Sequence, residues 1–437
     1  MSDHKLIMVS FDALVNEDLT DLSRLPTFEH VIENGARAEK IRSIYPTFTY
    51  PCHVTMASGC YPDKTGVISN YEFRPGDDDP PWNWYHSTVK CEDLLDVCHR
   101  AGYSTASVGW PASGGRENAD YLVSEIWPHR MPSDEETFRR LYIESGTSEE
   151  LYDEVVAPRI GMRLKRSQPD SSFFLIDIAC DLIKKHRPDV MLIHVGNIDA
   201  YRHDTGVFSE KVERGVRECD EMLSRLISAC TEAGTMEKTD LAVVSDHGHL
   251  DVSRIVNVNV RLRREGLIRV DENGEVASWD AWCASAGLSA YVILKDKKDT
   301  IIYNKVKALL DEMKDEGVWG FSEVRTPEET EALEHLDGDF SFMLETDGYS
   351  KFEDAWTGSY VKECPMTVRG PRLGYHGHHP DKGPCPVFIG CGPSFIPGAR
   401  IPFAHLVDMA PTCARIMGVE LPSCDGRAMT ELLGGQI

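Results

Sequence analysis

Long apolar segments are absent from this sequence of 437 residues. No run of about 18 apolar residues occurs in it, and a helix that spans a membrane needs roughly that many. The opening stretch, MSDHKLIMVSFDALV, also lacks the basic region, apolar region and small-residue cleavage site of a secretory signal. We therefore expect a protein of the cytoplasm that has no membrane partner.

Positive charge is scarce as well. The 46 lysines and arginines stand against 71 aspartates and glutamates, a formal net charge of −25. This balance disfavours non-specific binding to DNA, RNA or an anionic membrane, so no nucleic acid polymer is expected as a partner. A small anionic substrate would need a bound cation that overrides the overall field locally.

Cysteine is present, but its arrangement excludes two roles. The thirteen cysteines are odd in number, lack the close spacing of a disulfide-rich scaffold and include no CxxC pair. A disulfide framework and a cysteine-based zinc site are therefore both disfavoured, and reduced thiols are expected.

Short apolar runs and helix-like stretches alternate along the chain. The apolar runs cover residues 5–14, 189–199, 240–248 and 386–395, and the stretches 88–101, 171–186, 209–233 and 405–418 have a helical pattern. Buried runs separated by helices predict an α/β fold with a mostly parallel central sheet and flanking helices.

Two stretches fit this core less well. Residues 70–90 are rich in Pro, Asp and Trp and predict a long surface loop, whose aromatic residues either stack on a ligand or fix the loop to the core. Residues 255–368 combine strand-like segments at 290–296 and 340–347 with a helix-like segment at 303–317. We interpret them as an α+β cap inserted into a catalytic core made of residues 1–254 and 369–437.

Carboxylates and imidazoles gather at the ends of the apolar runs. Sheets of this type bind ligands at the carboxyl ends of their strands, and a mixture of these side chains suits zinc or another first-row metal. Taken singly, a strand-end aspartate is more often a helix cap. As a set they supply six ligands, enough for two metals with one position left for a hydroxyl: Asp12, Asp199, His203, Asp246, His247 and His376.

Thr47 is the candidate for that hydroxyl. Thr49 is a plausible N-cap, with Pro51 in the first turn of a helix that runs to about Ser58. Thr47 would then precede a helix N-terminus, which favours an anion, and a metal at its oxygen would make an alkoxide available. The alternative is that Thr47 only completes a turn.

Five motifs, in order, resemble those of the nucleotide pyrophosphatase/phosphodiesterase branch of the alkaline phosphatase superfamily. They are SFDAL, YPTFTYPCHVTMASGCYPDKTGV, DAYRHDTG, SDHGH and GYHGHHPDKGPCPVFIGCGP, and the resemblance runs from residue 8 to about 427. It implies an alkaline phosphatase-like sheet and two divalent metal ions, zinc or alternatively manganese. One would be held by Asp199, His203 and His376, the other by Asp12, Asp246, His247 and the Thr47 oxygen.

The resemblance also implies a mechanism. Two metals would bracket the phosphoryl group of a nucleotide-like phosphodiester or pyrophosphate, and Thr47 would attack in line to give a phosphothreonine intermediate. Phosphonate or phosphomonoester hydrolysis at the same site is the alternative reaction. A metal-binding scaffold whose cap recognises a partner is the non-enzymatic alternative.

Three residues depart from the family pattern. Cys52 stands where an asparagine is common, Phe48 where a basic residue follows the nucleophile, and Arg202 where a glycine precedes the second metal histidine. Cys52 either contacts substrate as a weak donor or packs on the first helical turn. The expected substrate-binding residues are Cys52, Phe48 and Tyr71.

Overall fold

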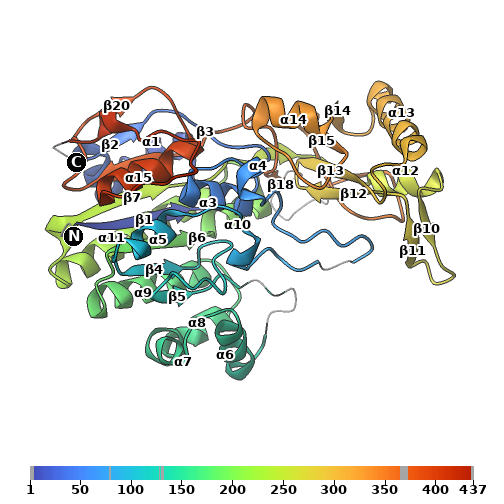
Figure 1. The fold of residues 1–437 in the computed structure, drawn as a ribbon. Coiled ribbons are helices and arrows are strands. Elements are labelled where there is room, and N and C mark those ends of the chain that lie inside the picture. The colour runs from blue at the N-terminus through green and yellow to red at the C-terminus, as the bar shows by residue number, and fades with distance from the viewer. Residues whose placement is uncertain (1–3, 78–79, 127, 129–131, 365–372, 435–437) are drawn as a thin grey trace.

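A large mixed sheet forms the centre of the molecule (Figure 1). The computed structural model describes residues 4–77, 80–126, 128, 132–364 and 373–434. Within them the sheet has eight strands in the order β20-β2-β19-β7-β1-β6-β4-β5. The strands from β7 to β5 are all parallel, whereas β19 is antiparallel to both of its neighbours. The predicted mostly parallel sheet is thus confirmed.

The apolar runs form the inner strands of this sheet. They become β1 (Lys5–Phe11), β6 (Val190–Val195), β7 (Thr239–Val244) and β19 (Phe388–Cys391). The remaining strands are short: β2 (Ala36–Ala38), β4 (Thr105–Val108), β5 (Tyr121–Val123) and β20 (Arg400–Ile401). Each apolar run ends as a strand before its polar residues, which places those residues in the loops at the strand ends.

Helices cover both faces of the sheet, because its strands are apolar on both sides. Along β1, Leu6 and Met8 belong to one buried cluster, and Ile7, Val9 and Phe11 to the other, as the two-residue period of a strand requires. Helices α2 (Pro26–Asn34), α9 (Asp170–Lys185) and α11 (Glu210–Glu232) contribute to the second cluster. The first includes α3 (Thr49–Ser58), α5 (Leu94–Arg100) and α15 (Met409–Met417).

Helix α5 is shorter than the predicted segment 88–101, for a local reason. Oδ1 of Asp93 accepts hydrogen bonds from the backbone N–H groups of Leu95 and Asp96 at 2.9 and 3.1 Å. This N-cap starts the helix at Leu94.

The cap carries a sheet of its own. Its four antiparallel strands lie in the order β12-β13-β15-β14, and helices α12 (Val258–Arg264), α13 (Thr300–Glu316) and α14 (Pro327–Glu334) accompany them. The strands are β12 (Ala281–Ala286), β13 (Ser289–Leu294), β14 (Phe321–Arg325) and β15 (Phe342–Thr346). The strand-like and helix-like segments predicted in the cap correspond to β13, β15 and α13. The predicted boundary at 368 falls outside the described residues.

Polar contacts attach the cap to the core near α3. The Tyr45 hydroxyl donates to Glu345 Oε2 at 2.9 Å, and the Tyr291 hydroxyl donates to the Ile68 carbonyl at 2.7 Å. Arg42 pairs with Glu334 at 3.0 Å. The cap lies at one end of the molecule and both chain termini at the other (Figure 1).

The predicted loop at 70–90 packs against the core through its aromatic residues. The Tyr71 and Trp82 rings lie 4.6 Å apart, and Trp82 in turn lies 5.4 Å from the ring of Tyr50 on α3. A short 3-10 helix covers His86–Thr88, and residues 78–79 lie outside the described part. No helix among the described residues is long and apolar enough to cross a membrane.

Candidate active site

Asp199 is the centre of a first group of possible metal ligands. Helix α10 (Asn197–Thr205) starts directly after β6, so Asp199 and His203 lie one helical turn apart on the same face. Strands β8 (Leu250–Val252) and β18 (Leu373–Tyr375) pair antiparallel, which brings His249 and His376 beside them. The Nε2 atoms of His249, His203 and His376 lie 2.8, 3.3 and 3.8 Å from Asp199 Oδ1.

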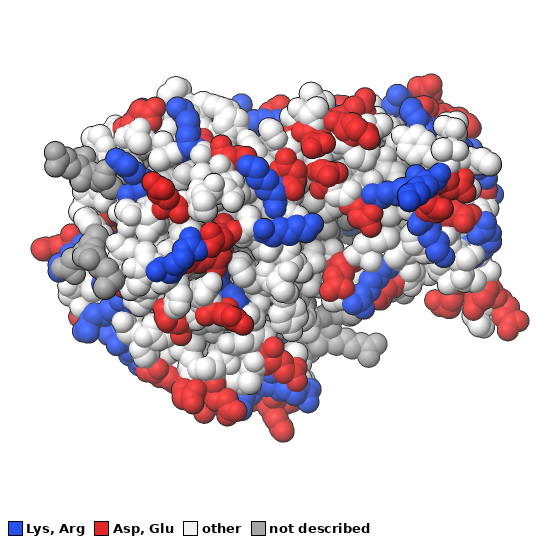
Figure 2. Space-filling model, viewed as in Figure 1, with Lys and Arg blue, Asp and Glu red and all other residues white. Residues whose placement is uncertain are grey.

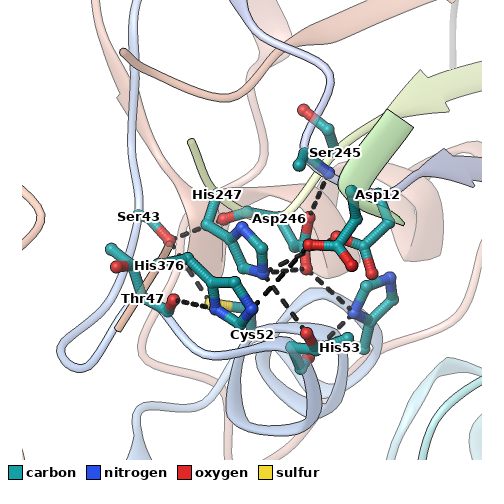
Figure 3. A network of polar contacts seen from close by, with 12 residues as sticks. Asp12, Ser43, Thr47, Cys52, His53, Ser245, Asp246, His247 and His376 are labelled. Atoms are coloured by element: carbon teal, nitrogen blue, oxygen red, sulfur yellow. Dashed lines mark hydrogen bonds and ion pairs between the residues drawn. The ribbon is translucent and has the colours of Figure 1, made fainter. Parts of the chain in front are cut away.

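His247 is the centre of a second group, built from neighbouring strands. Asp12 follows β1, and Asp246 and His247 follow β7, which pairs with β1. His247 Nε2 lies 3.1 Å from Asp246 Oδ2, 3.6 Å from Asp12 Oδ1 and 3.3 Å from the Thr49 hydroxyl. Figure 3 shows Asp12, Asp246 and His247 turned toward one another, with His376 beside His247.

Both groups have the dimensions of a metal site. Neighbouring ligand atoms in a tetrahedral zinc site lie about 3.3 Å apart, given metal–ligand bonds of about 2.0–2.1 Å. The contacts to Asp199 Oδ1, from 2.8 to 3.8 Å, and those to His247 Nε2, from 3.1 to 3.6 Å, surround this value. Atoms of Asp12, Asp199 and His247 also lie within 4.8 Å of one another, so the two groups adjoin.

The ionisation of Asp12, Asp246, His247 and His376 also suits divalent cations. At His203, by contrast, burial is outweighed by the neighbouring Asp199 carboxylate, which raises the pKa of the imidazole. Burial, together with the charge of Asp199, raises the pKa of Asp12 to about 6, and burial and Asp12 raise that of Asp246. Burial holds the pKa values of His247 and His376 well below the usual range, so their imidazoles are neutral, as ligands must be. Asp12 Oδ1 and Asp246 Oδ2 are buried without a hydrogen-bond partner among the described residues. A cation would satisfy both atoms and remove the repulsion between the carboxylates.

A third cluster of acidic and imidazole groups is already neutralised. His86, Asp93 and Asp96 lie close enough to hold an ion. However, the buried guanidinium of Arg116 donates to Asp93 Oδ1 and Asp96 Oδ1 at 2.7 and 2.8 Å, and both carboxylates also serve in the capping box of α5. We assign this cluster to the stability of the fold.

The structure does not place the Thr47 hydroxyl with the metal-binding groups. Thr47 Oγ1 donates to the His378 carbonyl at 2.9 Å and accepts from the Gly377 N–H at 3.0 Å, so the backbone occupies it on both sides. Its side chain is 1% exposed. The Thr47 carbonyl accepts from His376 Nδ1 at 3.0 Å, which orients that imidazole. Thr47 therefore supports a ligand, and the expectation that its oxygen meets the metal does not agree with this geometry.

The Thr49 hydroxyl, unlike that of Thr47, lies beside the second group of possible ligands. The N-cap of α3 is Phe48, not Thr49 as expected, because Thr49 is already helical. The Thr49 hydroxyl is therefore not used for capping. It faces His247 and borders the cavity above the two groups.

Buried residues around the two groups hold the ligands in place. His194 Nε2 lies 3.0 Å from Asp12 Oδ2, and His53 Nδ1 lies 3.4 Å from Asp246 Oδ2. Arg202, which departs from the family pattern, is fully buried and donates to the carbonyl of Ala13 at 3.1 Å and to the carboxylate of Asp18. It thereby ties α10 to the loop that carries Asp12.

A cavity of about 820 Å³ opens over these residues. Phe48 and Tyr71, two of the expected substrate-binding residues, line it, and their rings lie 6.4 Å apart. Cys52, the third, is fully buried among apolar residues, with its Sγ 3.4 Å from Ser43 Oγ, and is not part of the lining. The remaining wall includes Trp82, Trp356 and Tyr375 together with Lys351 from the cap.

Sequence reasoning missed Asn70 and gave no role to His249. Asn70 borders the cavity, and its Oδ1 accepts from the Tyr50 N–H at 2.8 Å, which leaves its amide NH₂ for the cavity. No local pattern distinguishes Asn70 from other loop asparagines. His249, by contrast, stands in the motif SDHGH, so its alternate spacing from His247 was a usable signal.

The fold and the site together define an alkaline phosphatase-like α/β protein with candidate positions for divalent metal ions. Comparison with protein families identifies it further. The model of the family described as type I phosphodiesterase/nucleotide pyrophosphatase matches residues 6–344. The chain belongs to this family, which is named after hydrolases. This confirms the resemblance predicted from the sequence.

Known relatives are distant in sequence. A Caenorhabditis elegans ectonucleotide pyrophosphatase/phosphodiesterase is 25% identical over 264 residues, which cover 60% of this chain and 28% of the relative. Human bis(5′-adenosyl)-triphosphatase ENPP4 is 20% identical over 428 residues, 95% of this chain and 78% of that protein. The chain spans about a quarter of the length of the first curated relatives it matches, 24–28% of each.

Solved structures share the fold. Human ectonucleotide pyrophosphatase/phosphodiesterase 5 superposes with a TM-score of 0.67 at 16% identity, covering 99% of this chain and 100% of that one. An inactive threonine-to-alanine variant of the murine protein, in complex with AMP, has a TM-score of 0.66 at 17% identity with the same coverage.

Proposed function

We propose that this protein hydrolyses phosphodiester or pyrophosphate bonds in a small nucleotide-like substrate, with Thr49 as the nucleophile and two divalent metal ions, zinc in preference to manganese. One observation carries the proposal. The Thr49 hydroxyl borders the cavity and lies 3.3 Å from His247 Nε2, the atom on which the carboxylates of Asp12 and Asp246 also converge, and the Asp199 group adjoins it.

The two groups of residues would each hold one ion. Asp12, Asp246, His247 and the Thr49 oxygen form one set, and Asp199, His203 and His376 belong to the other. When bound, such ions lower the pKa of a hydroxyl and neutralise the charge of a phosphoryl group.

Thr49 is positioned for attack by the start of α3. The extended backbone at Phe48, with φ −123° and ψ 138°, gives way to the helix at Thr49, and this change directs the hydroxyl toward His247. The positive end of the helix dipole favours the negative charge of a phosphoryl group at the same point. Attack by Thr49 Oγ1 on phosphorus would form a phosphothreonine while the P–O bond to the leaving group breaks, and the leaving oxygen would take up the proton lost from the threonine hydroxyl. Attack of a water molecule on the same phosphorus would then break the Oγ1–P bond, release the phosphoryl product and restore the hydroxyl.

Asn70 supplies a donor for a phosphoryl oxygen in place of Cys52. Because its amide oxygen is fixed by the Tyr50 N–H, its NH₂ group is available to the cavity. A neutral amide aimed at the charge that develops during transfer stabilises the transition state.

The aromatic wall of the cavity supports a nucleotide-like substrate. Phe48, Tyr71, Trp82 and Trp356 offer flat apolar surfaces on which a base can stack. The murine neighbour that was solved with AMP supports the same class of ligand.

A panel of substrates tests the proposed function. Zinc-loaded protein is compared on the p-nitrophenyl ester of thymidine 5′-monophosphate, bis-p-nitrophenyl phosphate and p-nitrophenyl phosphate. We expect the nucleotide diester to be hydrolysed fastest, the activity to disappear with a chelator and to return with zinc. Preference for the monoester would replace the proposal by a phosphomonoesterase, and inactivity on all three would overturn it.

A further inference from the structure

His249 lies within the Asp199 group, and the resemblance to the family assigns it no role there. It is fully buried and immediately precedes β8. Its Nε2 makes the shortest of the three imidazole contacts to Asp199 Oδ1, at 2.8 Å. Asp199, His203, His249 and His376 each offer one ligand atom, and all four atoms lie within 4.8 Å of one another.

We propose that His249 is a fourth protein ligand of the metal ion held by Asp199, so that three imidazoles and one carboxylate surround this ion. The inference rests on the proposed function in one respect, the presence of a metal at this site. The three Nε2 atoms converge on one carboxylate oxygen at 2.8 to 3.8 Å, the range in which ligands of one tetrahedral ion lie (about 3.3 Å).

The arrangement of the rings supports ligation. The His249 ring lies 4.7 Å from that of His203 and 5.0 Å from that of His376, so the three imidazoles enclose the same space. A histidine that served only to orient Asp199 by a hydrogen bond would need contact with the carboxylate alone. The Nε2 atoms of His249, His203 and His376 instead point to one place, which is the arrangement expected of three ligands of one ion.

His249 differs from the other two imidazoles on its outer side. His203 Nδ1 and His376 Nδ1 contact the carbonyls of Gly374 and Thr47 at 2.9 and 3.0 Å, an outer contact that is typical of metal ligands. His249 Nδ1 is buried and has no hydrogen-bond partner among the described residues. His249 is therefore the least constrained of the three and the ligand that an incoming substrate oxygen displaces most easily.

Four protein ligands change the character of the site. Catalytic zinc sites keep one position open, whereas sites with four protein ligands are closed. We expect His249 to increase metal affinity at this site at least tenfold, and to be the group that gives way when substrate binds.

Three variants separate ligation from hydrogen bonding. His249→Cys retains a strong metal ligand, His249→Gln retains a side-chain donor for Asp199 but ligates poorly, and His249→Ala retains neither. His405→Ala is the control, because His405 is partly buried, lies outside both groups and also has a ring nitrogen with no hydrogen-bond partner in the part of the chain that the structure describes. Each protein is loaded with cobalt, and the bound cobalt per chain, its dissociation constant and its absorption spectrum are measured.

We expect the wild-type protein and His405→Ala to bind two cobalt ions with the same spectrum. His249→Cys should keep both ions and gain a near-ultraviolet thiolate-to-cobalt absorption that the wild-type protein lacks. His249→Gln and His249→Ala should bind one ion at least tenfold more weakly. Circular dichroism confirms that each variant is folded.

Two results would overturn the inference. One is a His249→Cys protein that binds two ions without the thiolate absorption, and the other is a His249→Gln protein with the wild-type spectrum and affinity. A wild-type protein that binds no cobalt would instead overturn the metal site itself, which is a failure of the proposed function.

Discussion

The core and the cap of this protein are both built from strands and helices, but they contribute differently to the site. In the core, β1, β6 and β7 run parallel and side by side, so polar residues such as Asp12 and His247, more than 200 positions apart, meet at the carboxyl ends of these strands. In the cap, β12 to β15 pair antiparallel around a separate apolar cluster. The core contributes the candidate ligands and the candidate nucleophile, and the cap contributes part of the cavity wall.

Charge is distributed differently in the two regions of the site. The core side presents a cluster of buried carboxylates, whereas the cap adds Lys351 next to the carboxylates of Glu353 and Asp354. Lys351 Nζ lies 2.8 Å from the Tyr375 hydroxyl and 3.1 Å from Glu353 Oε1. On the face drawn in Figure 2, acidic and basic side chains are interspersed over both regions. We therefore expect chemistry to depend on the core and substrate affinity on the cap. Substitutions at Thr49, Asn70 and Lys351 test this division, and a fourth at Asp354 tests a buried carboxyl group of the cap.

Thr49→Ala, a change in the core, should have the largest effect, and this effect should appear in kcat. Loss of the nucleophile should lower kcat by at least about 10³-fold with both metal ions still bound, as removal of a nucleophile does elsewhere. Thr47→Ala, the matched control, removes a hydroxyl of the same kind that contacts only backbone, and should retain most of kcat. Single-turnover kinetics and metal analysis are the measurements. Equal losses in the two variants would contradict the assignment of Thr49.

Asn70→Ala should lower kcat by about 10²-fold, the usual effect of removing one donor to a developing charge. Metal content should be unchanged, because Asn70 contacts the backbone of Tyr50 and none of the ligands. Asn83→Ala, a second amide of the same loop whose Nδ2 donates to the Ser69 carbonyl at 2.8 Å, is the control. A kcat equal to that of the wild-type protein would remove Asn70 from the mechanism.

Asp354→Asn should change the pH dependence of stability through the cap. Burial raises the pKa of Asp354 to about 6, although the Ser285 N–H opposes this at 2.7 Å. The proton is thus held more tightly in the folded state, and the stability it contributes is complete below about pH 4 and lost as pH rises through about 6. The asparagine does not titrate. Between pH 4 and pH 8 the free energy of unfolding of the variant should therefore rise by about 1–2 kcal/mol relative to that of the wild-type protein.

Urea unfolding of both proteins at each pH, in the presence of a chelator, measures this difference in the free energy of unfolding. The core carboxylates titrate in both proteins, so their contribution cancels in the difference between the two free energies of unfolding. A difference that stays constant with pH would show that Asp354 titrates normally in the folded cap.

Lys351→Met should have the smallest effect and appear in KM. Removal of this cation from the cavity wall should raise KM by about tenfold for substrates with a further phosphate, about 1.4 kcal/mol of binding, and leave kcat almost unchanged. Lys362→Met is the control, since Lys362 lies near the same Glu353 but is exposed. A loss of kcat instead would show that Lys351 takes part in the chemical step. It would contradict the division into a core that performs chemistry and a cap that binds substrate.

Predictions from the sequence were most reliable where the chemistry is local. The apolar runs determined the inner strands, and the polar residues that follow them determined the ligand types. None of the thirteen cysteines is paired in a disulfide within the described part of the chain. The helix at 88–101 was too long, since the capping by Asp93 depends on side-chain geometry that the apolar pattern does not contain.

By itself, the sequence determined the mostly parallel sheet, the family and the carboxylates and imidazoles of the candidate site, because these depend on residue type and on order along the chain. Only the tertiary structure decided between two threonines that are two positions apart. The backbone changes from extended to helical at Phe48, so alternate residues no longer share a face, and Thr47 turns to the backbone while Thr49 turns to His247. It also decided the places of Asn70 and His249, because contacts between distant segments bring them to the cavity and to the Asp199 group.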